Sequence, residues 1–80
     1  MQTIMTKYLG PTNSRGPRIK ATCWNGTATV SYAYEKETRD NHQAAAEALI
    51  AKLSEKADVD WKIIACGHLP DGVGYAFIIE

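Results

Sequence analysis

Apolar and polar residues alternate along two neighbouring stretches of the chain, which is typical of strands with one buried face. Every second residue is apolar between residues 18 and 24, and residues 27–34 repeat the pattern. Asn25 and Gly26 lie between the two stretches and tolerate the positive φ angles of a two-residue type I′ turn. We therefore predict a hairpin with these two turn residues. Its register would pair Trp24 with Thr27, Cys23 with Ala28, Ala21 with Val30 and Ile19 with Tyr32.

Three further strands are predicted around this hairpin. Residues 3–9 are rich in β-branched and aromatic types and end at the breaker pair Gly10 and Pro11. Residues 10–17 hold two glycines and two prolines and predict a loop. Residues 61–66 and 75–79 predict two C-terminal strands that are apolar on both faces. Such strands indicate that part of the face without a helix is also buried.

A helix is predicted from Asp40 to Lys56. Asp40 can serve as its N-cap, because Gln43 follows at the spacing of a capping box. The segment consists mainly of Ala, Leu, Glu and Lys, which are strong helix formers. The apolar residues that recur on one helix face are Ala46, Leu49, Ile50, Leu53 and Ala57.

The order of elements is therefore β-β-β-α-β-β. It predicts an α+β fold in which an antiparallel sheet of about five strands carries one helix on one face, within a single domain of residues 1–80. The second face must be solvated, cover itself or be buried by a partner. We expect a homodimer, formed through that face or through an edge strand, as one way to cover it.

Length and composition exclude several classes of protein. A chain of 80 residues has a thin core that competes with any enclosed substrate cavity. There is no apolar run long enough for a membrane span and no signal peptide pattern, so we expect a cytoplasmic protein in a host cell, without a membrane partner. Cys23 and Cys66 form no CxxC pair, so neither a disulfide scaffold nor a zinc module is expected.

Charge is distributed unevenly although the formal net charge is zero. Residues 1–34 contain four bases and no acid, whereas residues 35–80 contain nine acids and five bases. This asymmetry suits a charged partner, or it lets one half of the fold attract the other.

No catalytic constellation is evident in the sequence. His42 and His68 have no nucleophile or carboxylate placed beside them, and we expect both to be surface or capping residues. There is no GxSxG motif, and no pair of carboxylates stands out as acid and base. We therefore expect no enzyme activity, no cofactor and no metal site.

The segment from residue 10 to residue 20 combines turn residues with Arg15, Arg18 and Lys20. Glycine-containing turns and arginine forks bind phosphate oxygens, so these cations are candidates for contact with nucleic acid. Exposed Tyr8, Trp24 and Tyr34 could then stack on bases. The sequence pI of 6.7 argues against nucleic-acid binding, because nucleic-acid modules are usually strongly basic. In a purely structural alternative, the arginines pair with the acids Glu35, Glu37 or Asp40.

Two stretches resemble a family of very small proteins encoded by phages, prophages and plasmids. They are TKYLGPTNSRGPRIKA, residues 6–21, and NHQAAAEAL, residues 41–49. Some proteins of this kind are anti-CRISPR proteins that act on type I systems, and this chain is similar to inhibitors of type I-C. The resemblance implies an inhibitor that binds the Cascade surveillance complex and keeps target DNA from being engaged, but it carries over no binding residues.

Charge supplies the candidates for docking. Carboxylates spread over one surface can occupy a lysine-lined groove that otherwise holds nucleic acid. The residues expected at such an acidic surface are Glu35, Glu37, Asp40 and Glu47. Two alternatives stay open: a small nucleic-acid-binding protein that uses the basic loop, and an adaptor that acts only as a dimer.

Overall fold

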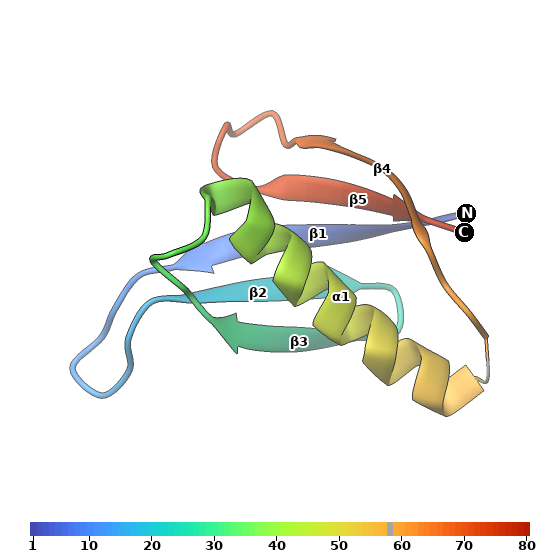
Figure 1. The fold of residues 1–80 in the computed structure, drawn as a ribbon, viewed down its shortest axis with the longest axis horizontal. Coiled ribbons are helices and arrows are strands. Elements are labelled where there is room, and N and C mark those ends of the chain that lie inside the picture. Colours follow the sequence, from blue (N-terminus) through green and yellow to red (C-terminus); the bar gives the residue numbers. More distant parts are fainter. Residues whose placement is uncertain (58) are drawn as a thin grey trace.

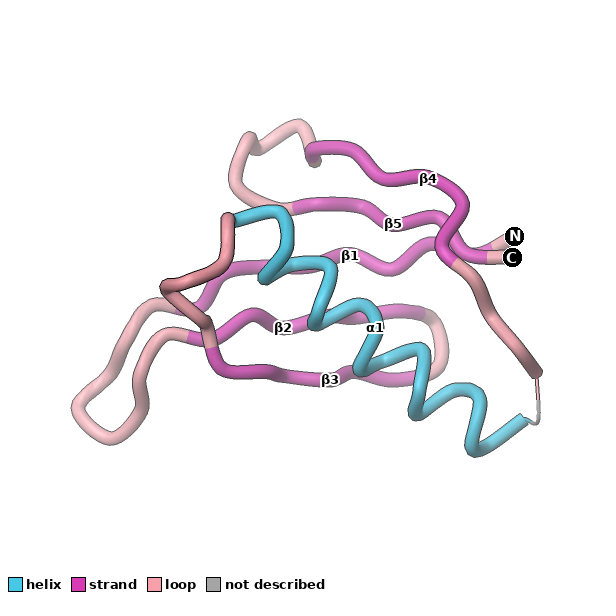
Figure 2. Tube along the Cα trace, viewed as in Figure 1, coloured by secondary structure: helices cyan, strands magenta, loops and turns pink. Residues whose placement is uncertain are grey.

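The computed structural model confirms the predicted α+β arrangement of five antiparallel strands and one helix (Figures 1 and 2). It describes residues 1–57 and 59–80, with only the backbone at Ala57. Asp58, one of the nine acids of the C-terminal half, lies outside the described residues. The elements are β1 Gln2–Leu9, β2 Arg18–Cys23, β3 Gly26–Ser31, α1 Thr38–Ala57, β4 Ile63–His68 and β5 Tyr75–Ile79.

The strand order in the sheet is β3-β2-β1-β5-β4, so the first and last strands of the chain pair at its centre (Figure 1). Ile4 of β1 lies directly opposite Phe77 of β5. Both termini consequently lie at the same end of the sheet (Figure 2). The two hairpins, β2–β3 and β4–β5, flank the strand β1 and leave β3 and β4 as the edges.

The helix α1 covers only one part of one face. It packs on β3, β2, β1 and β5, whereas within the described residues no Cα atom of α1 lies within 8 Å of one in β4. Burial alternates accordingly: Ile4 and Thr6 of β1 are buried under the helix, whereas Met5 points the other way and is 50% exposed. The buried apolar residues between sheet and helix are Ile4, Ile19, Ala21, Ala28, Ala45, Ala46, Leu49, Leu53, Tyr75, Phe77 and Ile79.

The hairpin forms as predicted, but the predicted register is wrong by two residues. Cys23 pairs with Gly26, so the two turn residues are Trp24 and Asn25. Gly26 begins β3 with a φ of 145°, which favours glycine, and the Asn25 amide donates to the Cys23 sulfur at 3.4 Å. A shift of two residues keeps every side chain on its face of the sheet. The pairs are therefore Thr22 with Thr27, Ala21 with Ala28, Lys20 with Thr29, Ile19 with Val30 and Arg18 with Ser31.

The predicted N-cap at Asp40 is also wrong, because α1 begins at Thr38 and Asp40 lies in its first turn. The position of the helix start is fixed by the buried side chain of Asn41. Its Oδ1 accepts a hydrogen bond from the Ala33 amide at 2.7 Å, and its Nδ2 donates to the Ala33 carbonyl at 2.9 Å. The same Nδ2 also donates to the Glu37 carbonyl at 3.1 Å. These bonds tie the helix to the segment that follows β3.

The fourth strand begins two residues later than predicted and has one buried face at most. It runs from Ile63 to His68, and an irregularity between Ile63 and Ala65 shifts its register against β5. Ile64 is 50% exposed at that irregularity, and on β4 only Ile63 is partly buried, so the burial expected on part of the helix-free face does not extend to β4. On β5 the helix-free side chains Ala76 and Ile78 are partly buried.

His42 is the largest departure from expectation. It was predicted at the surface, but only 1% of it is exposed, because it lies in the first half of α1 on the face toward the sheet. Its Nδ1 lies 2.7 Å from Oγ1 of Thr6 on β1. The His42 ring packs on Tyr75, with centroids 4.7 Å apart, and exposed His68 packs on the same tyrosine at 4.5 Å.

Candidate functional site

Four cations gather on the helix-free face and at the loop beside it. Lys7 of β1 lies directly opposite Lys20 of β2, and Arg18 lies two residues from Lys20 on the same face. Arg15 belongs to the loop that joins these strands. Like charges directly opposite each other on a sheet destabilise it, so this arrangement does not serve the fold. We call Lys7, Arg15, Arg18 and Lys20 the basic strip.

Hydroxyl groups extend the basic strip across the edge strand β3. Thr29 is the register partner of Lys20, and Ser31 is the partner of Arg18; both are exposed. Strands β1, β2 and β3 contain no acidic residue. This part of the helix-free face therefore offers cationic and hydroxyl donors, which are the side chains that contact phosphate groups in nucleic-acid complexes.

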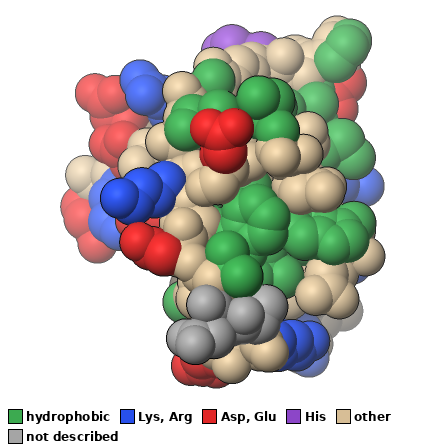
Figure 3. All heavy atoms as spheres, turned by 90° about the vertical axis from the view of Figure 1, so that its right-hand side faces the viewer, with side chains coloured by type: hydrophobic (Ala, Val, Ile, Leu, Met, Phe, Trp, Pro, Cys, Tyr) green, Lys and Arg blue, Asp and Glu red, His purple; other side chains and the backbone are tan. Residues whose placement is uncertain are grey.

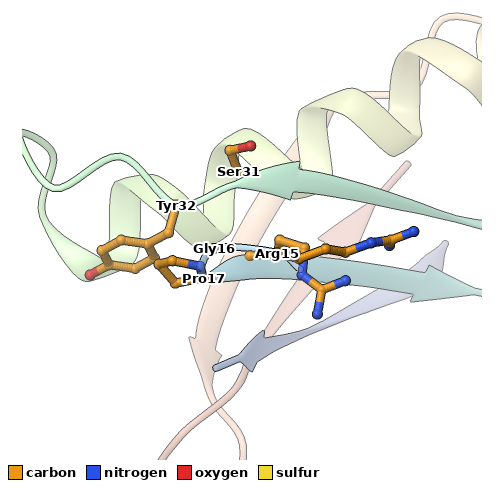
Figure 4. A pocket seen from close by; sticks show the side chains of 6 residues that line it. Arg15, Gly16, Pro17, Ser31 and Tyr32 are labelled. Atoms are coloured by element: carbon orange, nitrogen blue, oxygen red, sulfur yellow. The ribbon is translucent and has the colours of Figure 1, made fainter. Parts of the chain in front are cut away.

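A pocket of about 400 Å³ opens where the strip reaches the loop (Figure 4). In Figure 4 the ring of Tyr32 lies beside Pro17 at one side of the pocket, and Arg15 lies at the other side. Nε of Arg18 is buried there without a hydrogen-bond partner. Nε of Arg18 consequently makes no bond to Glu35, Glu37 or Asp40, the acids that a purely structural role would use.

The loop that carries Arg15 is closed on itself. The Thr12 amide donates to the Arg15 carbonyl at 2.7 Å, and the Arg15 amide donates to Oγ1 of Thr12 at 3.1 Å. At the other end of the loop, the Tyr32 amide donates to the Pro17 carbonyl at 3.0 Å. These bonds fix the backbone from which the Arg15 side chain extends.

Three tyrosines lie at the same end of the sheet. Tyr8 and Tyr34 each pack against Tyr32 in an edge-to-face manner, with centroids 5.5 and 5.3 Å apart. Tyr34 is 76% exposed and Tyr8 is 37% exposed, as the sequence predicts for both. Tyr32 also lines the pocket of Arg15 and Arg18, which we call the arginine pocket. The cluster of three tyrosines and the basic strip therefore adjoin each other.

A shallow groove of about 430 Å³ forms the other margin of the strip. Its lining includes Lys7 and Lys20 together with Met5, Leu9 and Asp71. The Asp71 carboxylate accepts hydrogen bonds from the backbone amides that follow it, at 2.9 and 3.1 Å. These bonds, and to a smaller degree the charge of Lys7, lower the pKa of Asp71 below its ordinary value. Asp71 is therefore held in the loop as a turn residue.

The four predicted acidic residues occupy the helix side of the molecule. Glu35 and Glu37 precede α1, Asp40 lies in its first turn, and Glu47 lies seven residues further along; all four are exposed. The cations Lys36 and Arg39 lie between them in the sequence. We call Glu35, Glu37, Asp40 and Glu47 the acidic surface; it is less uniform in charge than the basic strip.

No family model, no curated protein and no solved structure matches this chain. Within residues 1–57 and 59–80, no three of the His, Cys, Asp and Glu side chains gather as a metal ion requires. The described part of the chain also holds no helix with the length and apolar character of a membrane span.

The end of the molecule that carries both termini is apolar at its centre (Figure 3). Trp24 from the β2–β3 turn packs edge-on against Trp61, with centroids 5.5 Å apart. Trp24 is 53% exposed, as predicted, and Val59 is 43% exposed. A groove of about 390 Å³ continues from Trp61 between α1 and the start of β4. Trp24 therefore lies away from the basic strip, at the opposite end from the tyrosines.

The structure brings together all three of the basic residues expected from the sequence and adds Lys7 to them. Lys7 could have been found from the strand pattern, because it alternates with Thr6 and Tyr8 and so points to the face opposite theirs. Its position opposite Lys20 depends on the pairing of β1 with β2, which the sequence did not supply.

Proposed function

We propose that this chain is an inhibitor that binds a type I Cascade surveillance complex, of type I-C, and prevents the complex from binding target DNA. The observation that carries the proposal is the exposure of all four carboxylates of the acidic surface on the helix side of the molecule. A stoichiometric binder needs no catalytic group. The resemblance of residues 6–21 and 41–49 to small mobile-element proteins points in the same direction.

Electrostatic complementarity explains how such docking would work. A path that holds DNA presents lysines and arginines at its surface, and exposed carboxylates are attracted to it over about a Debye length. Complementary potentials raise the association rate and fix the orientation of docking. A small protein seated on that path excludes the duplex by volume as well as by charge.

The test is co-purification of the chain with type I-C Cascade, followed by measurement of duplex DNA binding by the complex. We expect stable association and loss of DNA binding. The charge reversals Glu35→Lys, Glu37→Lys, Asp40→Lys and Glu47→Lys together should weaken the association on the order of tenfold or more, in the direction expected for steering charges.

Two controls define the docking surface. Glu55→Lys reverses one exposed acidic residue near the end of α1 and should leave the association unchanged. Arg15→Glu combined with Lys20→Glu neutralises the basic strip, because two positive and two negative charges then remain on it, and should do the same. If the fourfold acidic variant still binds Cascade as the parent does, the acidic surface is not the docking surface. If the parent chain forms no complex, the inhibitor proposal is wrong.

A second candidate function is nucleic-acid binding by the chain alone. The observation that favours it is the convergence of the basic strip with exposed hydroxyls on an acid-free part of the sheet. The formal net charge of zero is less of an objection once four of the nine positive charges are seen to gather in the basic strip, away from the acidic surface.

A further inference from the structure

We propose that the nucleic acid held by the basic strip is single-stranded, with its phosphates on the strip and an unpaired base stacked on Tyr34. This inference rests on the second candidate function and specifies its ligand. Three features of the described residues carry it: the donors of the sheet face, the arginine pocket, and the exposed tyrosine beside that pocket.

The spacing of the donors suits a phosphate backbone that runs along the sheet. Side chains two residues apart on one strand, such as Arg18 and Lys20, lie roughly 6.6 Å apart, and neighbouring strands lie about 4.8 Å apart. Thr29 and Ser31 stand beside these two cations on β3. Successive phosphates can therefore each meet a cation and a hydroxyl.

The arginine pocket supplies a site that the fold leaves incomplete. Arg18 is partly buried and its Nε has no partner, and burying a polar group without a hydrogen bond costs free energy. Because solvent does not reach that nitrogen, a phosphate in the pocket would bind the terminal guanidinium nitrogens of Arg15 and Arg18, both of which line it (Figure 4). Two guanidinium groups at one pocket fit the bidentate geometry of phosphate.

The exposed ring of Tyr34 favours a single strand over a duplex as the ligand. It is 76% exposed and is held edge-on by Tyr32, whose hydroxyl lies 3.4 Å from Oγ1 of Thr38. A base can stack on such a ring only if it is unstacked from its own neighbours, which a duplex does not allow. Helix α1 offers no uniformly basic face for a groove, because the acids Asp40, Glu47 and Glu55 are spread along it among its cations.

Binding of labelled oligonucleotides of about 12 nucleotides, followed by fluorescence anisotropy, tests the inference. The isolated chain is titrated with single-stranded DNA, single-stranded RNA and the duplex of the same sequence. We expect at least one single strand to bind on the order of tenfold more tightly than the duplex. The slope of log affinity against log salt should be about −2 to −3, since up to four cations contact phosphates of a single strand.

Variants separate stacking from charge. Tyr34→Ala should lower the affinity for the single strand roughly five- to hundredfold with the salt slope unchanged, and Tyr34→Phe should restore it. Arg15→Gln should lower the affinity and reduce the slope by about 0.7. Lys56→Gln, which removes an exposed cation at the far end of α1, is the matched control and should change neither quantity.

Each outcome bears on one proposal. Equal affinity for duplex and single strand, with no effect of Tyr34→Ala, would overturn the single-strand inference while nucleic-acid binding stands. No binding to any of the three oligonucleotides at low salt would overturn both. Neither result touches the Cascade inhibitor proposal, because that complex is absent from the titration.

Discussion

The two faces of the sheet use alternate residues of the same strands for opposite purposes. On the helix-covered face of β1 and β5, Ile4 and Phe77 are fully buried opposite each other. On the helix-free face of β1, Met5 is half exposed and Lys7 stands opposite another lysine. One face gains free energy by removing apolar surface from water, whereas the other keeps charges together at a cost.

This difference shows where function is to be sought in a domain with a thin core. Most side chains that stabilise the fold lie under α1, whereas the opposed lysines on the open face cost stability. Function commonly retains such unfavourable groups, because stability and binding compete for the same positions. The basic strip is the clearest example in this molecule.

The largest predicted effect comes from comparing the loss of a side chain on the two faces of β5. Phe77→Ala empties a fully buried site, and we expect it to lower the free energy of unfolding by about 3 to 5 kcal/mol. Ile78→Ala removes a partly buried side chain from the helix-free face and should cost roughly 1 kcal/mol. Urea unfolding followed by circular dichroism measures both values.

The Ile78 variant also tests the expected homodimer. If Ile78→Ala costs as much as Phe77→Ala, or if its cost grows with protein concentration, then a second copy covers the helix-free face. If its cost stays near 1 kcal/mol at every concentration, that face of β5 is open to solvent.

The next prediction concerns the attachment of α1 to the helix-covered face. Asn41→Ala removes both hydrogen bonds to Ala33 and leaves the backbone groups of Ala33 without these partners. Loss of a buried partner costs about 1 to 3 kcal/mol, so we expect a loss of about 2 kcal/mol in urea unfolding. Asn41→Asp keeps the acceptor for the Ala33 amide but sets a carboxylate oxygen against the carbonyls of Ala33 and Glu37, so it should lose about as much at pH 7. Equal losses for the two variants would show that the amide nitrogen carries the attachment.

Local patterns in the sequence were sufficient for the element order, the hairpin and β5. Alternation assigned the faces of β2 and β3 correctly even though the register was wrong, since a shift of two residues preserves the faces. The turn could not be placed from residue type alone. Asn25 and Gly26 favour positive φ, but in the structure Gly26 uses it as the first paired residue rather than within the turn.

The remaining errors come from contacts between distant parts of the chain. His42 is buried because Thr6, 36 residues away, offers its hydroxyl across the helix–sheet interface. Asn41 displaced Asp40 as the residue that fixes the helix start, since the end of β3 lies within its reach. The basic strip was predicted only along the chain, and its partner Lys7 follows from strand pairing. The acidic surface remains a prediction, for which the structure supplies only exposure.

The third prediction uses His42 on the helix-covered face. Burial, and to a smaller degree the charge of nearby His68, lowers the pKa of His42 below its ordinary value. The unfolded chain therefore binds a proton more readily than the folded one, and the protein loses stability as the pH falls below about 6.5. Urea unfolding at several values between pH 7 and pH 5 measures this loss, which for one proton cannot be steeper than about 1.4 kcal/mol per pH unit.

Two variants assign the pH dependence. His42→Asn keeps a polar group toward Thr6 but cannot titrate, so its stability should change less between pH 7 and pH 5. His68→Gln, at the exposed ring, should keep most of the slope. Asp71 does not interfere in this range, because its lowered pKa places its effect below about pH 4. An unchanged slope in His42→Asn would assign the pH dependence to other groups.

The smallest predicted effect has the opposite sign and is the most direct test of the comparison. Lys20→Gln removes the repulsion between Lys20 and Lys7 and should raise the free energy of unfolding by about 0.3 kcal/mol, within the range for cross-strand pairs. Lys7→Gln should do the same, and the double variant should gain less than the sum, because only one repulsion exists to be removed. The gain should disappear in about 1 M salt, where surface charges are screened.

A variant that is more stable yet binds the single strand less tightly would show that the lysine pair serves binding at the expense of the fold. If Lys20→Gln instead lowers stability at low salt, then Lys20 supports the sheet. Its position opposite Lys7 would then be no evidence of a function on the helix-free face.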